Sequence, residues 1–131
     1  MAFPYSSFGV NQVGYCVVTT KDLVAKNPDL VKRFVQATIK SYAETEKAPE
    51  AAVASMADIV GGTMNEDAGK AQALEVLKVT LGILFSAGNK DKVLGLNVDS
   101  DWADMVGLMK KYNGLDAAAD PKSFYTNAFI K

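Results

Sequence analysis

Residues 14–20, GYCVVTT, are the stretch of this chain with the composition of a β-strand. β-Branched residues dominate the stretch and an aromatic residue lies near its start, as is common in strands. A single strand leaves its backbone N–H and C=O groups unpaired, and such groups need partners. The pattern therefore predicts a strand that pairs with another segment, another chain or a part of the protein missing from this sequence.

From Lys21 onward, apolar residues recur at the spacing of a helix. We expect a short turn of helix after Thr20, and a long helix opened by Asn27, Pro28 and Asp29, which supply a cap, a first-position proline and an early acid. Similar signals open four further helices: Ala48-Pro49-Glu50, a Thr63/Glu66 capping box, Asp99-Ser100-Asp101 and Asp120-Pro121. The expected stops are Gly61-Gly62, a turn at residues 86–91 and Asn113-Gly114.

Four of these helices carry an apolar stripe that we expect to be buried. In chain order the stripes are Val31, Phe34, Val35, Thr38, Ile39 and Tyr42; Ala52, Val53, Met56, Ile59 and Val60; Ala71, Leu74, Leu77, Leu81 and Leu84; and Trp102, Met105, Val106, Met109 and Tyr112. The last helix is expected at residues 123–130. The predicted fold class is mainly α, about five helices with one N-terminal strand, because a single strand cannot build a parallel sheet.

Composition removes several classes of function. The chain has 131 residues, enough for one domain, and a formal net charge of −1, which gives no reason to expect nucleic-acid binding. Histidine, the commonest general base and metal ligand, is absent. The single cysteine, Cys16, cannot form an internal disulfide, and its apolar neighbours predict that it is buried. No segment approaches the roughly 18 apolar residues of a membrane span.

Candidate catalytic and metal sites are weak. Close acidic pairs occur at Asp99/Asp101, Glu66/Asp67 and Asp101/Asp104, each in a predicted first helical turn. There, carboxylates complement the helix dipole, and we assign them that role. Residues 99–101 lack the glycine and glutamate of a calcium loop. We predict no metal site, no cofactor and no catalytic residue.

The N-terminal loop is the candidate binding site. It places aromatic rings, hydroxyls and amides beside a flexible glycine, a mixture that suits a small polar ligand. A frayed terminus is the alternative that loop composition alone favours. The candidate ligand-binding residues are Tyr5, Ser6, Ser7, Phe8, Gly9 and Asn11.

Residues 17–38, VVTTKDLVAKNPDLVKRFVQAT, carry a recognisable pattern of strand, short helix and long helix. They resemble the substrate-binding proteins of nitrate, sulfonate, taurine and thiamine-pyrimidine ABC importers, which are type II periplasmic binding proteins related to the fungal thiamine-pyrimidine synthase. The resemblance extends to further segments in the same order: residues 3–9, Pro49-Glu50, Asp101-Trp102 and residues 120–130.

The resemblance implies the C-terminal portion of a two-lobed α/β fold. Residues 1–13 would be a cleft and hinge loop, residues 14–20 a hinge strand, and residues 21–131 a helical part of the first lobe, together one partial domain. The larger protein would bind a sulfonate, nitrate or pyrimidine precursor and deliver it to an ABC permease. It would be periplasmic, or extracellular and lipid-anchored, although the first residues show no signal peptide. We do not expect an enzyme, because the synthase uses a histidine and a cysteine-rich segment, whereas this chain has no histidine and one cysteine.

A second hypothesis belongs to another class of function. The chain would be a self-sufficient helical interaction module that forms a homodimer by pairing residues 14–20 across a two-fold axis.

Overall fold

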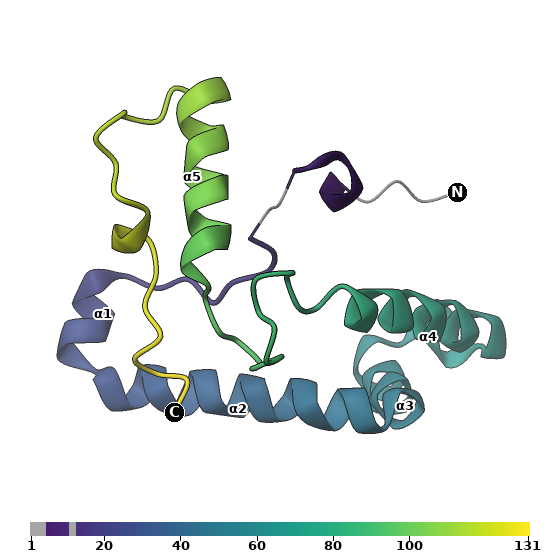
Figure 1. Ribbon diagram of the computed structural model, residues 1–131. Helices are drawn as coiled ribbons and strands as arrows, with labels where there is room; N and C mark the ends of the chain where they lie inside the picture. Colours follow the sequence, from purple (N-terminus) through teal and green to yellow (C-terminus); the bar gives the residue numbers. More distant parts are fainter. Residues whose placement is uncertain (1–4, 11–12) are drawn as a thin grey trace. The chain divides into compact units, whose positions relative to one another are not determined.

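The computed structural model describes residues 5–10 and 13–131. Within these residues the chain forms five α-helices and three short 3₁₀ turns (Figure 1). The order is η1 (Tyr5–Phe8), α1 (Lys21–Lys26), α2 (Pro28–Lys47), α3 (Pro49–Val60), η2 (Gly62–Asn65), α4 (Asp67–Gly82), α5 (Asp99–Tyr112) and η3 (Pro121–Ser123). The mainly α class predicted from the sequence is confirmed.

The predicted strand is not seen in this structure. Residues 14–20 have no strand conformation, and Figure 1 draws them as a plain trace that leads into α1. All seven are exposed, including Tyr15 and Val18, and Cys16 is exposed where burial was expected. The physical reason is the lack of a pairing strand among the described residues, since β-branched composition cannot supply a hydrogen-bonded ladder by itself.

Local capping explains where the first three helices begin. The Thr20 hydroxyl accepts a hydrogen bond from the Leu23 N–H at 3.1 Å and opens α1. Proline stands at the first position of both α2 and α3, where its missing N–H costs no hydrogen bond. Gly61 ends α3 with a φ of 68°, a conformation that glycine adopts freely. These boundaries confirm the expected starts and stop.

Two expected helix boundaries are wrong. Thr63 lies inside η2 rather than capping a helix, and α4 begins after Glu66, whose side chain makes no capping hydrogen bond. The extra 3₁₀ turn therefore replaces the predicted capping box. Near the C-terminus only Pro121–Ser123 is helical, because side chains from residues 125 and 127 bond to groups near the start of α5. Asp120 caps this turn by accepting from the Lys122 N–H at 3.0 Å.

The chain divides into two compact units, described here separately. In the unit of residues 1–36 and 85–131, the buried apolar residues are Val31 and Val106. In the unit of residues 37–84 they are Val53 and Ala57. Both cores are small among the described residues, so each leaves much of its apolar surface uncovered.

The expected buried stripes are therefore only partly confirmed. Of their members, Val31, Val53 and Val106 are buried. The stripe of α4 is at most half-buried, and Ala71 is exposed. Several large members are exposed because their own unit supplies too few side chains to cover them: Phe34, Tyr42, Met56, Ile59, Val60 and Tyr112.

One glycine is required by packing between η2 and α4. A Cβ atom on Gly69 would lie 1.9 Å from the Thr63 carbonyl oxygen, well inside the contact distance. Because Gly69 has no side chain, the backbone of η2 can pack directly against the first turn of α4. It also forms one end of the hollow described below.

Among the described residues, no helix has both the length and the apolar character needed to cross a bilayer.

Candidate functional site

The predicted binding loop is open to solvent. Tyr5–Phe8 winds into η1, and the Val10 N–H donates to the Tyr5 carbonyl oxygen at 3.2 Å, which closes the turn. Tyr5 and Phe8 are each 70% exposed, and Ser7 and Gly9 are exposed as well. Gly9 has a φ of 75°, and it has no side chain to cover its exposed backbone. Asn11 lies outside the described residues, and the side chain of Ser6 is not described.

The loop therefore offers flat aromatic surface, a hydroxyl and a side-chain-free backbone within five residues. These are the groups that orient a small polar molecule when a second surface encloses it. The assignment of the loop as a ligand site stays a prediction.

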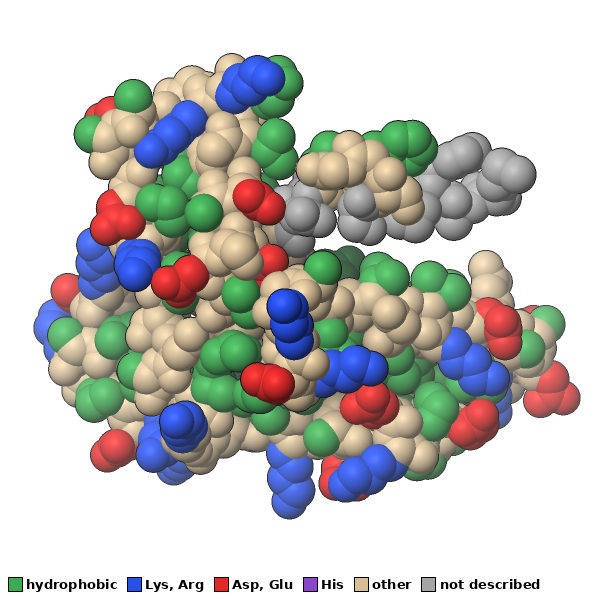
Figure 2. Space-filling model, in the orientation of Figure 1, with side chains coloured by type: hydrophobic (Ala, Val, Ile, Leu, Met, Phe, Trp, Pro, Cys, Tyr) green, Lys and Arg blue, Asp and Glu red, His purple; other side chains and the backbone are tan. Residues whose placement is uncertain are grey.

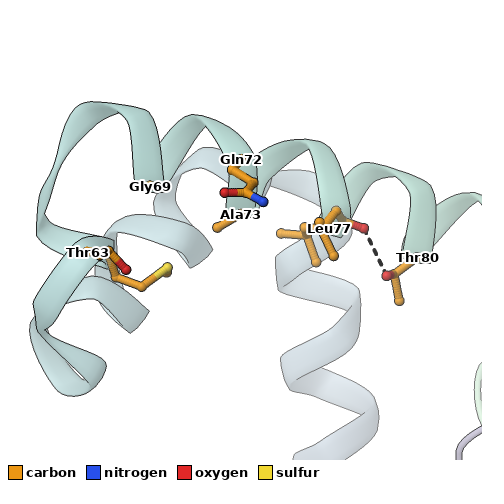
Figure 3. A pocket seen from close by; sticks show the side chains of 8 residues that line it. Thr63, Gly69, Gln72, Ala73, Leu77 and Thr80 are labelled. Atoms are coloured by element: carbon orange, nitrogen blue, oxygen red, sulfur yellow. Dashed lines mark hydrogen bonds between the residues drawn. The ribbon is translucent and has the colours of Figure 1, made fainter.

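A shallow hollow of about 430 Å³ lies between η2 and α4 (Figure 3). Figure 3 shows Gln72, Ala73 and Leu77 along α4, with Thr63 on η2 at the same end as Gly69. The lining is mainly apolar and carries no charged side chain. Thr80 contributes little polarity because its hydroxyl donates to the Val76 carbonyl oxygen at 2.9 Å. Such a surface could take an apolar group, with the Gln72 amide and the Thr63 hydroxyl as its remaining polar groups.

A network of side-chain contacts lies around the start of α5. The indole of Trp102 stacks on Tyr125 with ring centroids 5.3 Å apart and on Phe124 at 6.4 Å. Its Nε1–H donates to the Asn97 side-chain oxygen at 3.0 Å. Asn97 in turn bonds to Asn127, thirty residues later. We call Asn97, Trp102, Phe124, Tyr125 and Asn127 the aromatic–amide cluster.

A charged group adjoins this cluster at the first residue of α5. The Asp99 carboxylate accepts a hydrogen bond from the Tyr125 hydroxyl and lies 3.3 Å from the Lys122 ammonium. The Tyr125 hydrogen bond, followed by Lys122, lowers the pKa of Asp99, so this carboxylate is anionic at neutral pH. The same hydrogen bond raises the pKa of Tyr125 and keeps its phenol protonated.

These protonation states argue against acid–base chemistry at Asp99 and Tyr125. A general base needs a carboxylate whose pKa is raised toward neutrality, and a nucleophilic tyrosine needs a lowered one. Both shifts here have the opposite sign. The group therefore fastens the chain, and the expected role of Asp99 in the first helical turn is extended by a partner far along the sequence.

The contact between Asn97 and Asn127 was not predicted from the sequence. Their pairing has no local signal, since an asparagine near a helix start usually indicates a cap or a turn. Residues 124 and 125 were expected in a helix. Neighbouring residues of a helix point in different directions, so that prediction did not place both rings against α5.

Among residues 5–10 and 13–131, no group of three or more Cys, Asp or Glu side chains lies close enough to hold a metal ion. On the face shown in Figure 2, Lys and Arg side chains are interspersed with Asp and Glu, so this face presents no surface of a single sign.

Part of the chain matches a known family model. Residues 1–52 fit the model of the family described as NMT1/THI5 like, whose members are generally solute-binding components. The matched part includes the candidate loop, α1, α2 and the first residues of α3. No curated protein and no solved structure matches the chain. The match supports the resemblance for the first 52 residues, and the likeness of the later segments stays a prediction.

Proposed function

We propose that this chain is the C-terminal portion of a solute-binding component of an ABC importer. The observation that carries the proposal is the family match over residues 1–52, which contains the candidate binding loop. The larger protein would bind a small polar or anionic molecule, such as a sulfonate, nitrate or a pyrimidine precursor. It would act in the periplasm, or outside the cell on a lipid anchor, and deliver its ligand to a permease without changing it chemically.

The exposed apolar residues of the described chain support this proposal. Tyr15 is 98% exposed and Val18 is 87% exposed, immediately after the candidate loop. Large apolar side chains are normally covered when they occur in groups. A strand pairing with residues 14–20 in the rest of the protein would cover these two and would restore the hydrogen bonds of a hinge strand.

In the proposed site, Tyr5 and Phe8 provide flat contact area, while Ser7 and the backbone at Gly9 donate or accept hydrogen bonds. Ser6 and Asn11 complete the proposed set. The second side of the cleft would come from the other lobe, because a turn this open cannot remove a ligand from water. Binding would therefore need both lobes.

The test uses the protein encoded when the reading frame is extended upstream of Met1. Calorimetry measures its binding of taurine, nitrate and a hydroxymethyl-pyrimidine. We expect micromolar binding of one ligand and at least a tenfold loss of affinity in Tyr5→Ala. The matched control is Tyr112→Ala, a 68% exposed tyrosine on α5 that lies outside both the loop and residues 14–20, and it should keep the affinity. A stop codon directly upstream, or equal affinities in both variants, would contradict the proposal.

The second candidate, a homodimer through residues 14–20, is favoured by the exposure of all seven of these residues. Pairing across a two-fold axis would then cover Tyr15 and Val18 without any other protein. Light scattering of the chain over a hundredfold range of concentration separates the candidates. A dimer that dissociates in Val18→Asp supports the interaction module, and a monomer throughout rules it out.

A further inference from the structure

Residues 120–131 follow an irregular path beyond η3, yet side chains fasten them at several points. The Asn127 side-chain oxygen accepts from the Asn97 backbone N–H at 2.9 Å and from its side-chain amide at 3.2 Å. The Asn127 amide donates back to the Asn97 carbonyl oxygen at 2.9 Å. Both side chains are half-buried, where a lost partner costs more than at the surface.

The aromatic rings provide a second attachment. Tyr125 and Phe124 stack on Trp102 with planes inclined by 16° and 3°. Phe124 is 48% exposed, so this contact stays accessible to water on one side. Stacked pairs of this kind add to the free energy gained by burying their area.

The ends of the segment are held by polar contacts at the surface. Asp99 bonds to Tyr125 and pairs with Lys122, and both members of the ion pair are mainly exposed. At the far end, the Gln36 side chain donates to the Lys131 carbonyl oxygen at 3.0 Å. Exposed contacts of this kind are individually weak and are screened by salt.

We propose that residues 120–131 form a releasable strap that closes over Trp102 and opens by local unfolding while the helices stay folded. The attachments are side-chain contacts, and residues 124–131 have neither a helical nor a strand ladder of backbone hydrogen bonds. Segments held in this way open at a free energy below that of global unfolding. Closure fixes Asn97 and the first turn of α5, and opening bares the indole.

Trp102 is the single tryptophan of the chain and reports on the strap directly. We expect the amides of residues 124–131 to exchange with deuterium by an opening that leaves the middle of α5 protected. In Asn127→Ala, exchange at residues 97–102, which include the Asn97 amide that donates to Asn127, should rise at least tenfold, with a red shift of tryptophan emission and stronger acrylamide quenching. Exchange in α3 and α4 should stay unchanged.

Asn113→Ala is the matched control, since it removes an exposed amide at the other end of α5 and should leave exchange and emission as in the wild type. Tyr125→Phe is a milder variant that keeps the ring and removes the bond to Asp99, and it should raise exchange severalfold. The strap is ruled out if residues 124–131 exchange no faster than the middle of α5 in the wild type. Unchanged exchange in both Asn127→Ala and Tyr125→Phe would also rule it out.

Discussion

Asn97 and Asn127 hold each other through three hydrogen bonds, two to the Asn127 side-chain oxygen and one from its amide. Asn97 also accepts from the Trp102 indole at 3.0 Å. Asn97, which precedes α5, therefore joins the start of that helix to the C-terminal segment. The pair takes the place that backbone pairing would fill in a sheet, because each asparagine side chain carries both a donor and an acceptor.

A second asparagine organises the turn after α4. Asn89 is 7% exposed, and its side chain donates to the Val93 carbonyl oxygen at 2.8 Å and accepts from the Val93 N–H at 3.0 Å. Asn89→Ala leaves both backbone groups unpaired, and we expect a loss of about 1–3 kcal/mol in the free energy of unfolding. Urea denaturation measures it, with the exposed Asn113→Ala as the control. Equal midpoints for the two variants would show that the Asn89 bonds are not needed.

Gly69 is expected to be intolerant of substitution. In Gly69→Ala the new Cβ would overlap the Thr63 carbonyl oxygen, so η2 or α4 must move. We expect a loss of about 1–3 kcal/mol or more, the usual cost of overpacking. Gly107→Ala is the matched control, because a Cβ there meets nothing within 4 Å and alanine favours a helix interior by about 0.5–1 kcal/mol. Thermal melts should move in opposite directions, and a neutral Gly69→Ala would mean that the two backbones are not in contact.

Acid should release the contact between Asp99 and Tyr125. The pKa of Asp99 is lowered in the folded chain, so its contribution to stability is present above the ordinary aspartate pKa, near pH 4, and is lost as the pH falls through the lowered value. The raised pKa of Tyr125 keeps the phenol protonated up to and above about pH 10. Between these limits the contact is insensitive to pH.

A titration of Trp102 fluorescence from pH 7 to pH 2 tests this dependence. The wild type should show a change below about pH 4 that Asp99→Asn has already undergone at neutral pH. Asp58→Asn, which removes an exposed acid from α3, should keep the wild-type profile. Identical profiles for Asp99→Asn and the wild type would contradict the assignment.

Cys16 should react slowly with alkylating agents at neutral pH. Partial desolvation raises the pKa of its thiol, although the residue as a whole is exposed, and the sulfur lies 3.6 Å from the Gly14 carbonyl oxygen. Because the thiolate is the reactive form, the rate with iodoacetamide should rise at a higher pH than for an ordinary thiol near 8.5. The same chain in urea provides the reference. Coincident pH profiles for folded and unfolded chains would refute the shift.

The helix starts could be predicted from the sequence because their causes are local. Thr20, Pro28 and Pro49 act through bonds to residues within one turn, and the structure places helices where these residues predict them. The helix start predicted at Thr63 is wrong for a reason that is also local. The spacing to Glu66 fits a capping box, but residues 62–65 close a 3₁₀ turn first.

Burial and the aromatic–amide cluster could not be predicted in the same way. Periodicity shows that Phe34 and Ile59 lie on apolar faces of their helices, whereas their exposure depends on what packs against those faces. The strand expected at residues 14–20 is not seen for the same reason, since a strand needs a partner that no local pattern provides. The pairing of Asn97 with Asn127 requires two residues thirty positions apart to meet, and neither carries a local mark of that contact.

Calorimetry of the purified 131-residue chain with taurine, nitrate and a hydroxymethyl-pyrimidine tests the central claim most directly. If residues 5–9 form one side of a cleft whose other side belongs to a larger protein, the chain alone should bind none of them more tightly than about 1 mM, a binding free energy of roughly −4 kcal/mol. Binding in the micromolar range, near −8 kcal/mol, would show that the chain contains a complete site and would contradict the claim.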